Sequence, residues 1–150
     1  MQILQIIGKP GVGKSTLIRY IKRENPLWDY FDIAAHNEES DTFLSAENTI
    51  LKAIIRNGND CIIESACGFN ELTSKVIRCT LEHNKWVDRL KVRHPKVKDL
   101  DELLDYYSML ESQSLVPDEV LDLSETYAAE AAARYIIARY MTVEETYLFN

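Results

Sequence analysis

The sequence predicts an α/β protein in which a mostly parallel five-stranded sheet is covered by helices on both faces, giving three layers. Short apolar runs alternate along the chain with longer segments of helical periodicity, as in other proteins of this class. The first apolar run passes directly into a glycine-rich turn and then into a helical segment. The chain of 150 residues contains no internal repeat or linker-like stretch. We therefore expect residues 1–150 to form a single domain.

Five segments have the composition expected of strands. Residues 2–7 are apolar and rich in isoleucine, and residues 27–34 form the second candidate strand. Residues 60–64 form the third, residues 75–82 a less regular fourth, and residues 116–123 a fifth that polar side chains interrupt. Right-handed crossovers between parallel strands bring their carboxyl ends to one edge of the sheet. We expect the ligand site at that edge.

Helices are expected between these strands, because capping and chain-breaking residues mark their ends. The expected helices begin after the glycine-rich turn, at residue 41, at residue 84, after residue 99 and at residue 125. The residues that define these boundaries are Asn25-Pro26, Asp41, Asn57-Gly58, His94-Pro95, Asp99 and Ser124.

Residues 8–16 read Gly-Lys-Pro-Gly-Val-Gly-Lys-Ser-Thr and fit the phosphate-binding pattern G-x-x-x-x-G-K-[ST]. The glycines let backbone N–H groups point inward toward a polyphosphate, and the following helix presents its N-terminus to the same anion. Lys14 is expected to reach the β- and γ-phosphates and the Ser15 hydroxyl to ligate Mg²⁺. The sequence therefore predicts that ATP with Mg²⁺ contacts Gly8, Pro10, Gly11, Val12, Gly13, Lys14, Ser15 and Thr16.

Two carboxylates follow predicted strands at the same edge. Glu64 ends an apolar strand, which is the position of a carboxylate that holds the Mg²⁺ shell or accepts a proton from the attacking hydroxyl. Asp32 ends the second strand and is a candidate general base or ligand of an acceptor hydroxyl, with Asp29 as its rival if the strand is shifted. We expect Asp32 or Glu64 to handle the phosphoryl acceptor.

A basic segment interrupts an otherwise acidic chain. The formal net charge is −7, whereas residues 75–98 carry 8 lysines and arginines against 2 acidic residues. Arg89 and Arg93 lie four residues apart and share one face if the segment is helical. Arginines so placed can neutralise the charge that develops during phosphoryl transfer, so both are predicted to be catalytic. The acidic balance elsewhere argues against broad coating of nucleic acid.

Composition also restricts the compartment. Three cysteines without metal-type spacing favour free thiols in a reducing environment. No apolar run approaches the length of a membrane span, and the first predicted strand begins almost at the first residue. We therefore expect a cytoplasmic protein without a membrane partner. The oligomeric state is not indicated.

The layout resembles the P-loop kinases of the nucleotide-kinase-like group, which includes nucleoside and nucleotide kinases and 5′-hydroxyl polynucleotide kinases. Residues 8–16 carry the specific part of this resemblance. Residues 120–124 look like the strand and loop that flank adenine in that group, and Arg89 and Arg93 fall where it keeps its lid arginines. The resemblance implies a three-layer P-loop NTPase fold.

The polynucleotide kinase branch shares a GxPGxGKST loop and a helix that ends in Asn-Pro. That branch then carries an Arg-Asp-Asp-like segment with its general base, whereas residues 33–35 here are Ile-Ala-Ala. The 5′ end of an oligonucleotide is therefore not the favoured acceptor. Glu64-Ser65 is similar to the Glu-Arg-Ser of deoxynucleoside kinases without its arginine.

These observations predict an ATP-dependent kinase that transfers the γ-phosphoryl group to a hydroxyl or phosphate of a small molecule or nucleotide. The alternative is a regulatory module or NTPase that binds a nucleotide triphosphate and has no phosphoryl acceptor. A GTPase is disfavoured, because residues 84–88 carry one residue too many for the guanine-reading N-K-x-D motif. The sequence does not identify the acceptor.

Overall fold

The five strands form one parallel sheet. The computed structural model describes the backbone of residues 1–33 and 43–141 and the side chains of residues 1–33 and 49–141. The strands are β1 (Ile3–Ile7), β2 (Asp29–Asp32), β3 (Cys61–Ser65), β4 (Lys75–Thr80) and β5 (Glu119–Asp122), in the spatial order β2-β3-β1-β4-β5. All four neighbouring pairs are parallel. The predicted five-stranded α/β architecture is confirmed, and β1 lies at the centre of the sheet.

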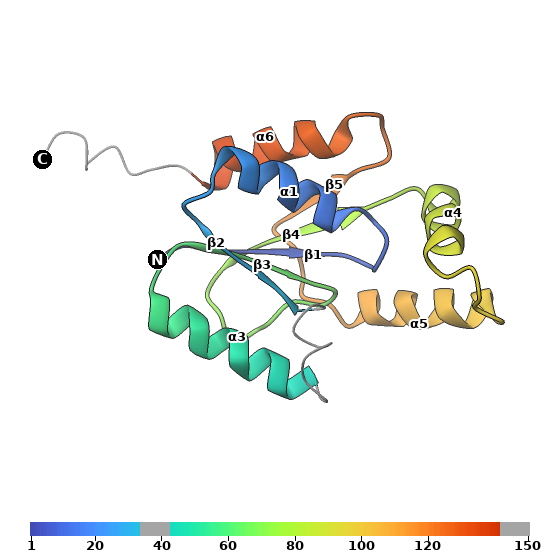
Figure 1. Ribbon diagram of the computed structural model, residues 1–150, viewed down its shortest axis with the longest axis horizontal. Coiled ribbons are helices and arrows are strands. Elements are labelled where there is room, and N and C mark those ends of the chain that lie inside the picture. Colours follow the sequence, from blue (N-terminus) through green and yellow to red (C-terminus); the bar gives the residue numbers. More distant parts are fainter. Residues whose placement is uncertain (34–42, 142–150) are drawn as a thin grey trace, which may run out of the picture.

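Helices lie on both faces of this sheet. On one face, α1 (Lys14–Glu24) and α6 (Ala128–Tyr140) lie side by side, and α3 (Phe43–Asn57) covers the other (Figure 1). The remaining helices, α4 (His83–Arg93) and α5 (Leu100–Ser112), stand beyond the carboxyl ends of the strands (Figure 1). They therefore border the edge of the sheet at which the ligand site is expected.

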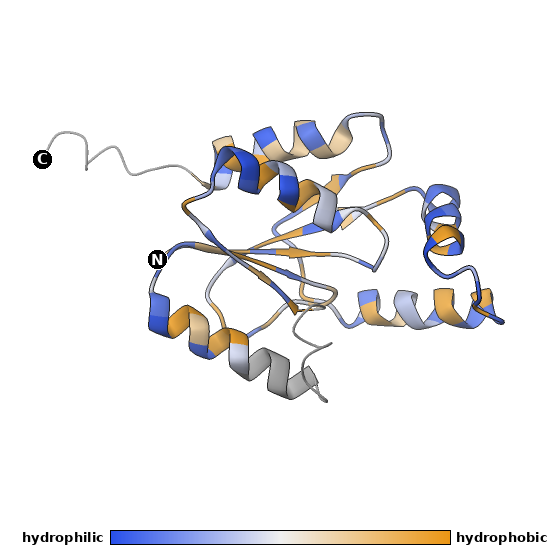
Figure 2. Cartoon of the chain, viewed as in Figure 1, coloured by the Kyte–Doolittle hydropathy of each residue, from blue (hydrophilic) through white to orange (hydrophobic). Residues whose placement is uncertain are grey.

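The hydrophobic core has two parts, one on each face of the sheet. The part under α1 and α6 includes the fully buried side chains of Leu4, Leu17 and Ile136. The part under α3 includes Ile54 and the β3 residue Ile63. The strands are coloured predominantly as hydrophobic in Figure 2, whereas α4 is mostly hydrophilic. Apolar strands buried on both faces are typical of parallel sheets, so the core explains the continuous apolar runs.

Most of the predicted boundaries agree with the structure. The C-cap of α1 is Asn25, and Asp99 caps α5 by accepting a hydrogen bond from the backbone N–H of Glu102 at 3.0 Å. Gly58 ends α3 with a φ of 64°, a conformation that glycine adopts without strain. The predicted cap Asp41 and residues 34–42 lie outside the described residues.

Two expectations are wrong. The second strand is shorter than residues 27–34, because Leu27 is 89% exposed in the turn before β2 and cannot contribute to the core. Ser124 does not cap the last helix, which begins at Ala128 after a left-handed residue, Tyr127. The Ser124 hydroxyl instead accepts a hydrogen bond from the N–H of Glu82, at 2.8 Å, and joins β5 to the start of α4.

The state of the cysteines and the length of the helices are two further features that the sequence analysis addressed. All three cysteines, Cys61, Cys67 and Cys79, are free thiols. None of the helices within residues 1–33 and 43–141 is long and apolar enough to cross a bilayer.

Candidate active site

The glycine-rich turn between β1 and α1, residues 8–16, is called the phosphate loop below, and it is tightly packed. Gly8 has a φ of 156°, and a Cβ atom at this position would lie 2.7 Å from the carbonyl oxygen of Cys79 in β4. Gly13, with a φ of 111°, is the N-cap of α1 and offers no side chain to the N–H groups of the first helical turn. Such N–H groups lack intrahelical partners, so the N-terminus of α1 is suited to binding an anion.

Lys14 lies at the first position of α1 and curls back over this loop. Its ammonium group donates hydrogen bonds to the carbonyl oxygens of Gly8 and, at 3.2 Å, of Lys9. The side chain is buried, and burial lowers the pKa of Lys14, against the opposing effect of the nearby Glu64 carboxylate. The loop thus holds a cation whose hydration is largely removed, which strengthens its attraction for a phosphate.

Ser15 and Glu64 meet across the loop. The Ser15 hydroxyl donates a hydrogen bond of 2.8 Å to a carboxylate oxygen of Glu64, at the carboxyl end of β3. In the β2–β3 register Asp32 is directly opposite Glu64, so two carboxylates end adjacent strands. Burial raises the pKa of Glu64, its hydrogen bond from Ser15 lowers it, and the charge of Asp32 raises it again.

Helix α4 packs directly against the phosphate loop. Trp86 is fully buried, and its indole N–H donates to the carbonyl oxygen of Pro10 at 2.8 Å. The Lys9 ammonium lies 3.9 Å from the centre of the same indole ring. One turn later, a guanidinium nitrogen of Arg89 lies 3.5 Å from the carbonyl oxygen of Gly11. The position of the arginine is therefore fixed by the packing of its own helix on the loop.

One cleft connects the phosphate loop with the carboxylates. Its volume is about 1360 Å³. Residues from the loop and α1, from the ends of β2 and β3, and from α4 and α5 line it: Pro10, Gly11, Gly13, Lys14, Ser15, Thr16, Asp32, Ile33, Glu64, Ser65, Ala66, Cys67, Gly68, Asp88, Arg89, Val92, Arg93, Tyr106, Leu110 and Gln113.

The structure brings together most of the residues that the sequence singled out. All five predicted catalytic residues (Lys14, Asp32, Glu64, Arg89 and Arg93) line this cleft. Two predicted loop contacts do not line it, because Gly8 lies against β4 and the Val12 side chain is buried in the core.

Asp29, the rival of Asp32, starts β2 at the opposite end of the strand. Its carboxylate accepts a hydrogen bond from the Asn59 side chain at 3.3 Å. Asp32 is therefore the β2 carboxylate that faces the cleft.

The sequence analysis did not identify Gln5, which holds a loop that lines the cleft. Gln5 is fully buried in β1, and its amide group forms two hydrogen bonds with the backbone of Phe69, one donated at 2.9 Å and one accepted at 2.7 Å. The backbone N–H of Gly68 also donates to the Ser65 hydroxyl at 2.9 Å. These bonds fix the loop after β3, which lines the cleft. A lone glutamine in an otherwise apolar strand was the available signal.

The oxygen atoms of Ser15 and Glu64 are suitable ligands for a magnesium ion. Mg²⁺ prefers oxygen ligands and is usually held by one or two protein side chains together with phosphate oxygens and water. The Ser15 hydroxyl and the Glu64 carboxylate supply two such oxygens, 2.8 Å apart. Within the described part of the chain, no group of three or more His, Cys, Asp or Glu side chains forms a metal cage. The site therefore fits a metal ion that is bound with a nucleotide.

No family model and no curated protein sequence matches this chain. Solved structures with the same fold include shikimate kinase from Bacteroides thetaiotaomicron, with a TM-score of 0.65 and 14% identity over 94% of this chain and 99% of that one. Another is shikimate kinase from Acinetobacter baumannii in complex with shikimate (TM-score 0.62, 14% identity, 100% and 94% covered). The tunicamycin resistance protein of Deinococcus radiodurans is also similar (TM-score 0.65, 14% identity, 92% and 94% covered). At this identity the likeness shows the fold alone, which this chain shares with the two shikimate kinases and the resistance protein.

Proposed function

We propose that the protein is a Mg·ATP-dependent phosphotransferase that transfers the γ-phosphoryl group to a hydroxyl or phosphate of a small molecule or nucleotide. The observation that carries the proposal is the continuity of the cleft from the phosphate loop, with Lys14 and Ser15, to the carboxylates Asp32 and Glu64. A donor and an acceptor can therefore occupy one continuous cleft. The kinases among the proteins of the same fold support phosphoryl transfer in general.

Each residue has a proposed role on the donor side. Lys14 and the N–H groups of the loop and of α1 bind the phosphates. Ser15 and Glu64 would hold Mg²⁺, which neutralises charge on the phosphates when it is bound. Arg89 and Arg93 line the cleft from α4 and would neutralise the oxygens of the transferring group.

Asp32 is the proposed general base. Glu64 accepts a hydrogen bond from the Ser15 hydroxyl, with which we propose it holds Mg²⁺. Asp32 lies on β2, one strand further from the loop. The acceptor hydroxyl oxygen would form a bond to the γ-phosphorus while the bond from that phosphorus to the β–γ bridging oxygen breaks. The hydroxyl proton passes to the Asp32 carboxylate, and ADP leaves.

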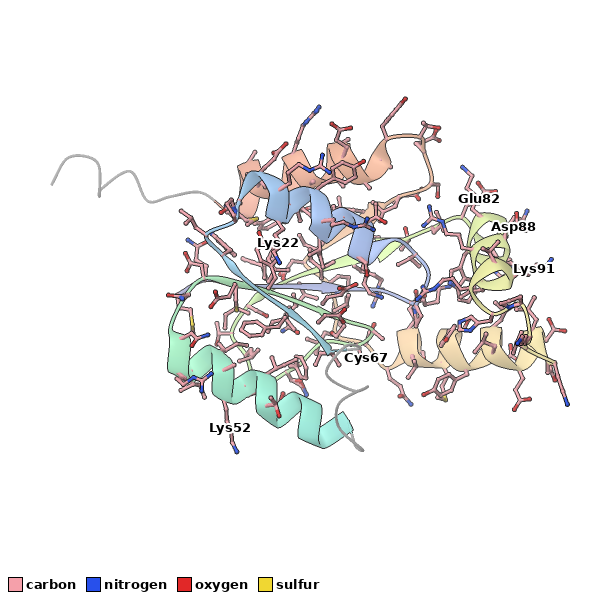
Figure 3. All side chains as sticks on the ribbon, in the orientation of Figure 1. Lys22, Lys52, Cys67, Glu82, Asp88 and Lys91 are labelled. Atoms are coloured by element: carbon pink, nitrogen blue, oxygen red, sulfur yellow. The ribbon has the colours of Figure 1, made fainter. Side chains whose placement is uncertain are left out.

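The test is ADP release from Mg·ATP in the presence of nucleosides, nucleotides, sugars and 5′-hydroxyl oligonucleotides. An accepted compound should accelerate release and appear as its phosphorylated product. Lys14→Ala should lower kcat by about 100-fold or more, because the charge that contacts the transferring phosphate is removed. Lys22→Ala, an exposed lysine two turns along the same helix, is the matched control and should retain full activity (Figure 3).

Two outcomes would contradict the proposal. Turnover that survives Lys14→Ala would mean that the loop is not the donor site. ATP hydrolysis at one slow rate regardless of the added compound would favour a nucleotide-binding module without an acceptor.

A further inference from the structure

Helix α5 carries two apolar stripes, and one of them packs on the core. Leu100, Leu104 and Tyr107 follow one another at helical spacing and contact the part of the core under α1 and α6. No side chain of this helix, all of whose residues the structure describes, is fully buried. A surface helix normally needs a single apolar stripe, which faces the core. The core therefore does not explain the second stripe of α5.

The second stripe faces the cleft. Tyr106 and Leu110 lie one turn apart on α5 and line the cleft, and the C-cap residue Gln113 continues the same face. Tyr106 is 52% exposed. On α4, Val92 lines the same cleft and is 81% exposed. Exposed apolar side chains that gather in one cleft are typical of a ligand site.

Hydrogen bonds hold the end of α5 that carries this stripe. The thiol of Cys67, in the loop after β3, donates to the carbonyl oxygen of Leu110 at 3.2 Å. The backbone N–H of Leu115 donates to the carbonyl oxygen of Cys67 at 2.8 Å. Arg78 of β4 donates to the Ser114 hydroxyl, also at 2.8 Å. The stripe is therefore fixed beside a loop that itself lines the cleft.

The stripe shares its cleft with the phosphate loop, which contributes Lys14 and Ser15 to the lining. Residues 36–42, which follow the cleft residue Ile33 closely in sequence, read His-Asn-Glu-Glu-Ser-Asp-Thr and supply no large apolar side chain that could cover Tyr106. A ligand with an apolar ring suits the stripe, because the burial of apolar surface and the stacking of rings both favour it. The acceptor is the ligand that the proposed reaction requires next to the triphosphate.

We propose, as an extension of the proposed phosphotransferase function on which it rests, that Tyr106 selects an acceptor that carries an aromatic or other flat apolar ring. The ring stacks on Tyr106 and packs against Leu110, and the reacting group is directed along the cleft toward the phosphate loop. Tyr106 contacts a part of the acceptor that does not react. It is therefore a specificity-determining residue, and its contact should affect acceptor binding more than the chemical step.

The test uses pairs of acceptors that share the reacting group and differ in the ring. Suitable pairs are phenylalaninol with alaninol and uridine with methyl ribofuranoside. Binding to the protein loaded with a non-hydrolysable ATP analogue is followed by NMR, and kcat/KM by ADP release. The member with the ring should bind and react better by about 10-fold or more.

The two proposals fail in different ways in this experiment. Equal binding and equal kcat/KM for the two members of each pair would overturn the inference and leave phosphoryl transfer intact. If no compound of either kind binds or reacts, the transfer function fails and the inference fails with it.

Substitutions on α5 separate ring stacking from general fit. Tyr106→Ala should raise KM for the member with the ring by about 10-fold, with kcat and the KM for ATP nearly unchanged, because the contact is made equally before and during phosphoryl transfer. Tyr106→Phe keeps the ring and should keep the preference. Met109→Ala is the matched control, because Met109 is an exposed apolar side chain of the same helix that does not line the described cleft.

An unchanged preference in Tyr106→Ala would overturn the inference. If the free energy of unfolding of that variant also falls, another part of the chain covers the ring in place of an acceptor. An equal loss of preference in Met109→Ala would show that the stability of α5, and not its cleft-facing stripe, sets the preference.

Discussion

At the scale of single residues, the charge of Asp32 influences the protonation of Glu64. The carboxylates end adjacent strands in register, and burial together with the charge of Asp32 raises the pKa of Glu64. A carboxyl group with a raised pKa binds its proton at a higher pH than an ordinary glutamate. Its charged form, which we propose to hold Mg²⁺ with Ser15, is therefore lost earlier as the pH falls.

Replacing Asp32 by a neutral residue should lower the pKa of Glu64. Asp32→Asn removes a negative charge beside Glu64, so the ionised form of Glu64 becomes easier to form and its pKa should fall. The measurement is a ¹³C NMR titration of the Glu64 carboxyl carbon, which does not depend on activity. Asp29→Asn, at the other end of the same strand, should leave the pKa of Glu64 unchanged. A rise of the Glu64 pKa in Asp32→Asn would contradict the proposed coupling.

At the scale of elements, Trp86 is the buried side chain of α4 that hydrogen-bonds the phosphate loop. Trp86→Phe keeps an aromatic ring but removes the hydrogen bond to Pro10 and part of the surface under Lys9. We expect the free energy of unfolding to fall by about 1–3 kcal/mol, because the partly buried carbonyl of Pro10 loses its donor and a small cavity forms. Denaturant unfolding measures this loss.

The same substitution should also weaken nucleotide binding, since Arg89 is positioned by the packing of α4 on the loop. Trp28→Phe is the matched control, because Trp28 is half-buried against the same core but precedes the amino end of β2, at the end of the parallel sheet opposite the loop. If both variants lose equal nucleotide affinity, α4 does not position the donor site.

The elements also show what the sequence could predict. Apolar periodicity located all five strands, and the glycine pattern located the donor loop, because both depend on residues that are neighbours in sequence. Asp32 and Glu64 were found because parallel strands bring their carboxyl ends together. The roles of Gln5 and Trp86 depend on contacts with Phe69 and Pro10, which lie 64 and 76 residues away, and local patterns carry no such information.

At the scale of the whole molecule, a ligand that binds only the folded protein stabilises all of it. Mg·ATP at 100 times its dissociation constant should therefore add about 2.7 kcal/mol to the free energy of unfolding. For a chain of this length that corresponds to an increase of about 5–10 °C in the melting temperature. The stabilisation should shrink when EDTA removes Mg²⁺, because we propose that Ser15 and Glu64 bind the metal together with the phosphates.

Lys14→Ala should lose this stabilisation at the same nucleotide concentration, and Lys22→Ala should retain it, when melting is followed by circular dichroism. The comparison is made between each variant with and without Mg·ATP, so a change in the intrinsic stability of a variant cancels. A melting temperature that rises equally in Lys14→Ala would place nucleotide binding outside the loop. Equal stabilisation with and without EDTA would remove Ser15 and Glu64 from the proposed metal site and leave the phosphate contacts of the loop as the source of affinity.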